Sequence, residues 1–202
     1  MAYTDFTLEV AEASLEVRAR PGEIFPGLQP VPVPGWLQDL LARGMQLALV
    51  SEKARSEFLV VPILLASREL SQDTLAIYSG QRLDVDPGRG LLGECDFILA
   101  LTEPVPRLRA PVVTVVEAKK NDIEAGLGPC IAQMVAAPLY NERQGLVIAA
   151  VYGCVTTGEA WQFLRLAGAD VILDRRRMYI DNVGGILAAF GAIVMWSGVQ
   201  AG

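Results

Sequence analysis

Histidine is absent from this chain of 202 residues. Without imidazole, the chain cannot build a Ser-His-Asp triad, a Cys-His nucleophile or a histidine-ligated metal site. Cysteine is scarce and never has the C-x-x-C spacing; the three residues are Cys95, Cys130 and Cys154, each inside an apolar run. Such cysteines are typical of buried thiols in a reducing compartment rather than of a disulfide framework. The chemistry of the protein must therefore rest on carboxylates, lysine or thiols.

Basic residues are fewer than acidic ones, 17 against 23, which gives a formal net charge of −6. The composition therefore gives no sign of the broad basic surface that dominates non-specific affinity for nucleic acids. Any contact with nucleic acid would have to be local and assisted by a metal ion. The first residues lack the basic and apolar regions of a signal peptide, so we expect a cytoplasmic protein.

Charged residues are missing from one long run, Val183 to Val199. Its length is at the low end of the roughly 17 to 25 residues that cross a bilayer, and a membrane anchor is one interpretation. The run follows Asp181-Asn182, a helix N-cap signal, contains several glycines, and has no lysine or arginine close by on either side. We therefore expect a buried C-terminal helix that covers a sheet, and no contact with a membrane.

Hydrophobic residues make up 52% of the chain, enough for a sizeable core, and we expect a single domain over residues 1–202. Apolar periodicity and turn residues predict the order of elements along the chain. The expected elements are an edge strand or hairpin over 6–17, a proline-rich connector over 26–34, amphipathic helices over 36–49 and 52–70 with Ser51 as the N-cap of the second, strands over 75–78 and 81–85, a helix that begins near Pro129, and a hairpin of strands over 146–155 and 160–166.

Two strongly apolar segments carry charged residues at their ends. The first, Gly93 to Leu99, contains Asp96, and the second, Val112 to Lys120, contains Glu117 and Lys119. Because side chains alternate between the two faces of a strand, Glu117 and Lys119 point the same way. A turn-prone segment with two prolines separates the two strands, so pairing across it would bring Asp96 beside Glu117.

This arrangement suits a hard cation. Mg²⁺ prefers oxygen ligands and is typically held by one or two carboxylates together with a substrate phosphate, so Asp96 and Glu117 suffice. Lys119 would supply an ammonium group on the same strand face, where it stabilises charge on the phosphate. A plainer interpretation is a solvated strand end, whose surface ion pairs contribute little to stability.

The order of a helix, three strands, a helix and further strands, with an Asp and a Glu-x-Lys on successive strands, resembles the PD-(D/E)XK nuclease superfamily. The resemblance covers roughly residues 50–166, where GECDFILAL, VVTVVEAKKNDIEAGLGPCIAQM and VTTGEAWQFLRL are similar to segments of uncharacterised bacterial nuclease-like proteins. It implies an α/β fold with a restriction-endonuclease-like core, in which helices flank a central mixed β-sheet. An N-terminal strand or helix extension and a C-terminal packing helix would complete the domain.

Residue by residue, the resemblance implies that Asp96 and Glu117 ligate Mg²⁺ or Mn²⁺, and that Lys119 orients the attacking water or stabilises charge. It implies Glu57, on the preceding helix, as a further metal ligand, and Gln133, on the following helix, as a polar residue directed toward the site. The implied activity is metal-dependent hydrolysis of phosphodiester bonds in DNA by an endonuclease-type enzyme, and many nucleases of this fold act as homodimers. The alternative is a catalytically silent scaffold of the same fold that binds nucleic acid or protein.

Overall fold

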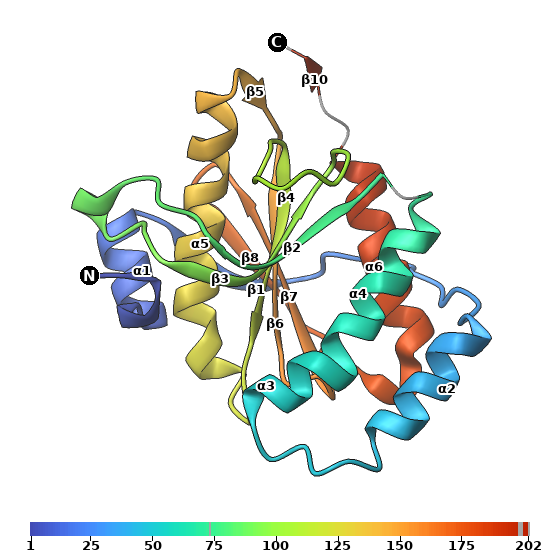
Figure 1. The fold of residues 1–202 in the computed structure, drawn as a ribbon. Coiled ribbons are helices and arrows are strands. Elements are labelled where there is room, and N and C mark those ends of the chain that lie inside the picture. The colour runs from blue at the N-terminus through green and yellow to red at the C-terminus, as the bar shows by residue number, and fades with distance from the viewer. Residues whose placement is uncertain (73, 198–199, 202) are drawn as a thin grey trace.

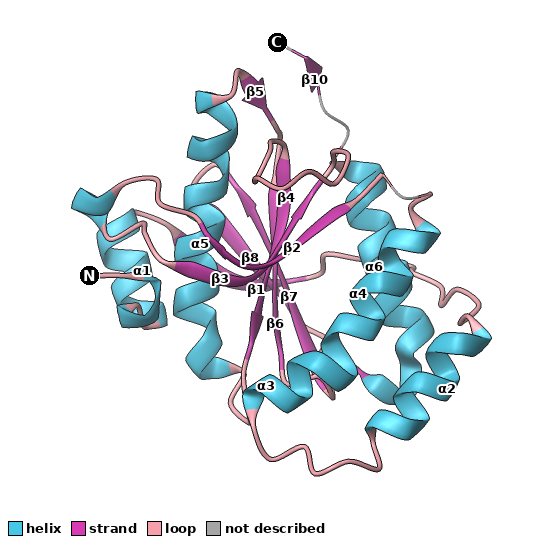
Figure 2. Cartoon of the chain, viewed as in Figure 1, coloured by secondary structure: helices cyan, strands magenta, loops and turns pink. Residues whose placement is uncertain are grey.

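The computed structural model describes residues 1–72, 74–197 and 200–201, which form an α/β fold around one mixed β-sheet of eight strands (Figures 1 and 2). The strand order is β1-β8-β7-β6-β4-β3-β2, and β9 pairs with β7. The strands are β1 (Arg18–Gly22), β2 (Ala76–Arg82), β3 (Glu94–Ala100), β4 (Val112–Ala118), β6 (Val151–Thr156), β7 (Ala160–Ala167), β8 (Asp170–Asp174) and β9 (Met178–Tyr179). The pairs β4–β6 and β1–β8 are parallel and the other pairs are antiparallel. A separate pair joins β5 (Leu146–Val147) and β10 (Gln200–Ala201).

Helices cover both faces of the sheet (Figure 1). On one face lie α1 (Leu8–Leu15) and α5 (Glu124–Arg143), and on the other lie α2 (Gly35–Gly44), α3 (Glu52–Arg55), α4 (Val61–Leu70) and α6 (Val183–Trp196). Each face has its own hydrophobic core, because the near-continuous apolar strands bury side chains on both sides. The second core contains the edge-to-face ring pairs that Phe190 of α6 makes with Trp161 and Phe163 of β7.

Residues 183–196 of the C-terminal apolar run form the buried helix that we expected, and residues 198–199 of that run lie outside the described residues. Nine residues of α6 are buried, and its N-cap is Asn182, whose side chain accepts a hydrogen bond from the backbone of Gly185. A Cβ atom at Gly184 would lie 2.5 Å from the carbonyl oxygen of Val31, so glycine there permits close packing against the connector. No helix within the described residues is long and apolar enough to cross a membrane.

The strand or hairpin expected over residues 6–17 is wrong, because this segment contains α1. The Thr7 side chain caps the helix by accepting a hydrogen bond from the Val10 backbone, and the helix ends at Leu15, followed by the C-cap Glu16 in a left-handed conformation. Ala11 and Leu15, four residues apart, are the buried positions. The helical spacing of these two buried residues therefore prevails over the apparent alternation of apolar and polar residues in the sequence.

The start of α5 was also predicted wrongly. The helix begins at Glu124 instead of near Pro129, and Pro129 and Pro138 both lie inside it. A proline inside a helix removes one backbone hydrogen bond and costs roughly 3 kcal/mol. Burial of the apolar side chains around Pro129, such as Leu127, Cys130 and Ile131, outweighs that cost, since each large apolar side chain contributes about 1.5 to 3 kcal/mol.

Two further differences concern strands. The predicted strands 75–78 and 81–85 are one strand, β2, and Gly80 within it has a positive φ of 62°. No element was predicted for β1, because its sequence contains Pro21, which argues against a central strand. In the structure β1 is an edge strand that pairs in parallel with β8. The Ser51 cap, the two strands with charged ends and the hairpin at Thr157-Gly158 are confirmed. The first strand of the hairpin begins at Val151 and not at residue 146, because Leu146–Val147 forms the separate strand β5.

Candidate functional site

The two acidic residues on β3 and β4 lie at neighbouring positions. The antiparallel register pairs Phe97 with Val116, so the next step outward sets Asp96 against Glu117. Asp96 Oδ2 also accepts a hydrogen bond of 2.7 Å from the backbone nitrogen of Ala118. This bond ties the aspartate to the end of β4, where the Glu-x-Lys segment leaves the sheet.

Glu117 lies at the centre of a short buried chain of polar groups. One of its carboxylate oxygens accepts a bond of 2.7 Å from Lys119 Nζ, and the other accepts a bond of 2.7 Å from Gln133 Nε2 on α5. Glu117 is only 5% exposed and Gln133 only 1%. The structure therefore brings together four of the five predicted site residues: Asp96, Glu117, Lys119 and Gln133.

Burial sets the electrostatics of this group. It raises the pKa of Glu117, and the neighbouring charge of Asp96 raises it further, against the opposing effect of Lys119. Burial also raises the pKa of Asp96, although the Ala118 hydrogen bond and Lys119 oppose this. Burial alone would lower the pKa of Lys119, but Glu117, Glu52 and Asp96 together raise it. Ionisation of both carboxylates is therefore costly, and Lys119 stays protonated.

An acidic pocket of about 330 Å³ lies beside this group, between β3 and the helix that starts at Glu52. Its lining includes the acidic residues Glu52, Glu57, Glu94 and Asp96. Glu57 forms an exposed ion pair with Lys53 at 3.8 Å, so it borders the pocket without contacting the buried group.

A π-turn explains why Glu52 and Glu57 border the same pocket. Residues Ser56–Val60 form this turn between α3 and α4. In an ordinary α-helix, residues five apart point well away from each other, but the wider π-turn brings them closer to one face. Sequence reasoning did not assign Glu52 to the site; its only signal is its place directly after the Ser51 cap.

The donor set is compatible with a divalent cation held by two carboxylates. Asp96 and Glu117 are adjacent, and Mg²⁺ needs only one or two carboxylates when substrate phosphate completes its coordination. The buried Oε1 of Gln133 has no hydrogen-bond partner in the part of the chain described, so the group holds an oxygen that is still unsatisfied. However, no cluster of three or more acidic or thiol side chains suited to a metal ion occurs among the described residues. Glu57 as a third ligand therefore stays a prediction, without support from the geometry.

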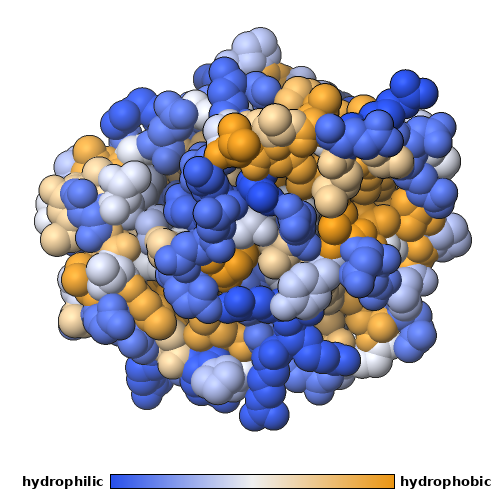
Figure 3. Space-filling model, turned by 90° about the horizontal axis from the view of Figure 1, so that it is seen from below, coloured by the Kyte–Doolittle hydropathy of each residue, from blue (hydrophilic) through white to orange (hydrophobic). Residues whose placement is uncertain are grey.

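The site lies at the end of the sheet where β4 and β6 finish and α3 begins, at the bottom of Figure 1. Figure 3 shows the molecule from that side, with hydrophilic residues gathered across the middle of the face and hydrophobic patches at its margins. No protein-family model matches the chain, and no curated protein sequence matches it.

The three cysteines behave as the sequence indicated. All are free and buried. Burial raises the pKa of each thiol, and the charge of Glu117 raises those of Cys95 and Cys130 further. A thiol that remains protonated is a poor nucleophile, so the buried cysteines are not suited to nucleophilic chemistry.

Proposed function

We propose that the protein is a metal-dependent phosphodiesterase of the nuclease type, with Asp96, Glu117 and Lys119 at its active site. The observation that carries the proposal is the convergence of two acidic residues from neighbouring strands with an ammonium group 2.7 Å from one of them. A site of titratable residues with perturbed pKa values, next to an open pocket, is typical of an active site.

The topology supports the restriction-endonuclease-like fold that the sequence resembles. Three antiparallel strands, β2, β3 and β4, lead into a parallel pair, β4 and β6, whose connection runs through α5. This order sets Asp96 and Glu117 on adjacent strands, and it sets Gln133 on the crossover helix that covers them.

Each residue has a role that follows from its contacts. Asp96 and Glu117 would hold Mg²⁺ or Mn²⁺, and when bound such an ion lowers the pKa of a water molecule and neutralises charge on a phosphate. Lys119 supplies a positive charge that stabilises a substrate phosphate as negative charge builds on it. Gln133 orients the Glu117 carboxylate from the side of α5.

The substrate class that we propose is DNA, cut by an endonuclease-type reaction in the cytoplasm. A homodimer would allow both strands of a duplex to be cut, because a two-fold axis relates two such sites. The acidic pocket makes direct contact with a polyanion unfavourable until a cation is bound, so we expect both binding and cleavage to depend on divalent metal.

A catalytically silent scaffold that binds nucleic acid or protein is the second candidate. Two observations favour it: the net charge of −6, and the absence, among the described residues, of a cluster of three or more acidic or thiol side chains suited to a metal ion. Under this hypothesis Glu117 and Lys119 form a structural ion pair and no bond is cleaved.

Plasmid nicking in Mg²⁺ and in Mn²⁺ separates the two candidates. We expect the wild type to nick plasmid DNA only when metal is present. Lys119→Met should lower the nicking rate roughly 100-fold, which is the loss that follows removal of one charge-stabilising group in other active sites. Asp96→Asn should abolish nicking, whereas Lys120→Met should retain it, since Lys120 is an exposed neighbour. Nicking that survives in Asp96→Asn would contradict the assignment. A wild type inert on duplex DNA, single-stranded DNA and RNA would favour the scaffold.

A further inference from the structure

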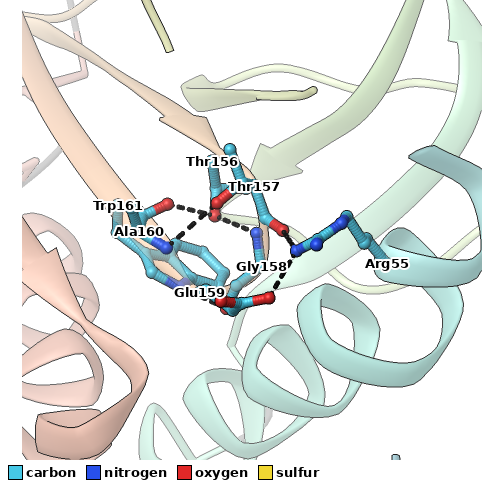
Figure 4. A network of polar contacts seen from close by, with 7 residues as sticks. All are labelled: Arg55, Thr156, Thr157, Gly158, Glu159, Ala160 and Trp161. Atoms are coloured by element: carbon cyan, nitrogen blue, oxygen red, sulfur yellow. Dashed lines mark hydrogen bonds and ion pairs between the residues drawn. The ribbon is translucent and has the colours of Figure 1, made fainter. Parts of the chain in front are cut away.

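Arg55, the last residue of α3, contacts the turn between β6 and β7. Its Nη1 atom donates to the backbone oxygen of Thr157 at 3.1 Å and to Glu159 Oε1 at 2.7 Å, so one group holds two points of the turn between β6 and β7 (Figure 4). The Arg55 side chain is 17% exposed, and its ion pair is therefore screened less than a surface pair.

The turn that Arg55 holds is rigid in itself (Figure 4). Thr156 Oγ1 donates to the carbonyl oxygen of Ala160 and accepts from the backbone of Gly158, and Thr157 Oγ1 accepts from the backbone of Ala160. Trp161 Nε1 donates to the carbonyl oxygen of Gly158 at 3.0 Å. A turn fixed by so many bonds moves as a unit, so a contact at one end of it constrains the other.

The other end of this turn contacts the candidate site. The carbonyl oxygen of Thr156 accepts a hydrogen bond of 2.8 Å from the backbone nitrogen of Lys119. It lies where the β4–β6 pairing ends, with Ala118 opposite Thr156. Lys119 is the first residue beyond β4, so this bond is its backbone anchor on the side of β6.

We infer that Arg55 is a positioning residue for Lys119. It holds the β6–β7 turn against α3, and the turn in its rigid form presents the Thr156 carbonyl oxygen to the backbone of Lys119, beside Glu117. The same contact fixes α3, whose first residue, Glu52, lies at the acidic pocket. The catalytic consequence rests on the proposed function, whereas the effect on the Lys119 backbone does not.

Arginine suits this role better than lysine. Its planar group presents several donors in a fixed geometry, and Nη1 here serves a carbonyl and a carboxylate at once. A lysine at this position retains the charge but loses the fixed geometry. Arg55→Lys should therefore have a partial effect, and Arg55→Gln, which removes the charge as well, a full one.

Hydrogen exchange of backbone amides, followed by NMR, tests the inference directly. In Arg55→Gln we expect the Lys119 amide to exchange at least 10-fold faster, and in Arg55→Lys by a smaller factor, while amides of β8 keep their wild-type rates. The matched control is Arg176→Gln, which breaks an ion pair of the same length, 2.7 Å, to Glu23. It should leave the Lys119 amide within twofold of the wild type.

Nicking kinetics supply the second readout. Arg55→Gln should lower kcat about 10-fold with KM unchanged, and Arg55→Lys should restore part of kcat. The inference is overturned if exchange at Lys119 rises no more than exchange in β8, because Arg55 would then act only on global stability. If exchange changes as expected but the wild type never nicks, the positional inference stands and the proposed function fails.

Discussion

Replacement of Lys119 with methionine tests the electrostatic structure of the site without any assumption about substrate. The change removes the ammonium group 2.7 Å from Glu117 Oε1 and retains most of the side-chain volume. The buried carboxylate then keeps the Gln133 amide as its side-chain partner and still faces the charge of Asp96. We expect Lys119→Met to destabilise the protein strongly at neutral pH.

The size of the effect follows from the distance and the burial. At an effective dielectric constant of about 20, opposite unit charges 2.7 Å apart attract by roughly 6 kcal/mol. Desolvation offsets part of this, and loss of one partner of a buried pair typically costs about 3 to 5 kcal/mol. Because the Lys119 side chain is 22% exposed, we expect the lower end, about 3 kcal/mol. In a chain of this length, that corresponds to a fall in Tm of roughly 6 to 12 °C.

Urea unfolding at pH 7.5, followed by circular dichroism, measures the loss. Lys120→Met is the matched control, and we expect a change within about 0.5 kcal/mol because Lys120 is exposed. The double variant Glu117→Gln with Lys119→Met should recover much of the loss, since it leaves no buried unpaired charge. At pH 5 the Lys119→Met deficit should shrink, because a protonated Glu117 needs no ammonium partner. A deficit below about 1 kcal/mol at pH 7.5 would refute the reasoning.

Three further predictions concern stability. Asn141→Ala should cost about 3 kcal/mol in urea unfolding, since the buried Asn141 amide pairs with both backbone groups of the first residue of β4, at 2.8 Å each. Gly158→Ala should cost about 1 to 3 kcal/mol more than Gly168→Ala in the same assay. Both glycines have a positive φ, but only at Gly158 would a Cβ contact another side chain, 2.9 Å away. Finally, the free energy of unfolding of the wild type, measured in urea from pH 7 to pH 5, should rise on acidification. The pKa values of Asp96 and Glu117 are raised in the folded state, so the folded protein binds more protons than the unfolded chain as pH falls toward their unfolded values near 4. The rise should be smaller in the variant with Asp96→Asn and Glu117→Gln, and an unchanged slope would contradict this assignment.

The placement of Asp96 beside Glu117 was predictable because the relevant signals are local. Both strands are apolar, the link between them contains three prolines, and alternation fixes which side chains share a face. Given an antiparallel pairing of adjacent strands, few registers are possible. The Lys119 contact with Glu117 followed from the same alternation.

The remaining parts depend on contacts that are distant in the sequence. The parallel pairing of β1 with β8 joins residues about 150 positions apart, and no local pattern indicates it. The π-turn, which places Glu52 and Glu57 along one pocket, precedes Pro62, but a proline after a helix start does not by itself predict a π-turn. The Arg55 contact with Glu159 likewise spans 104 residues. Tertiary packing, which local propensity does not report, decides each of these.

The burial of the Glu117–Lys119 pair bears on the choice between enzyme and scaffold. A buried ion pair is often no more stable than well-packed apolar side chains of similar volume, and here a second carboxylate, Asp96, adds repulsion. We therefore expect the pair to lower the stability of the fold relative to a well-packed apolar pair. A scaffold does not need buried charges at the end of two apolar strands. An active site that holds a cation and a phosphate does need them. If Asp96→Asn stabilises the protein at neutral pH while it abolishes metal-dependent nicking, the trade of stability for function expected of an active site will have been observed.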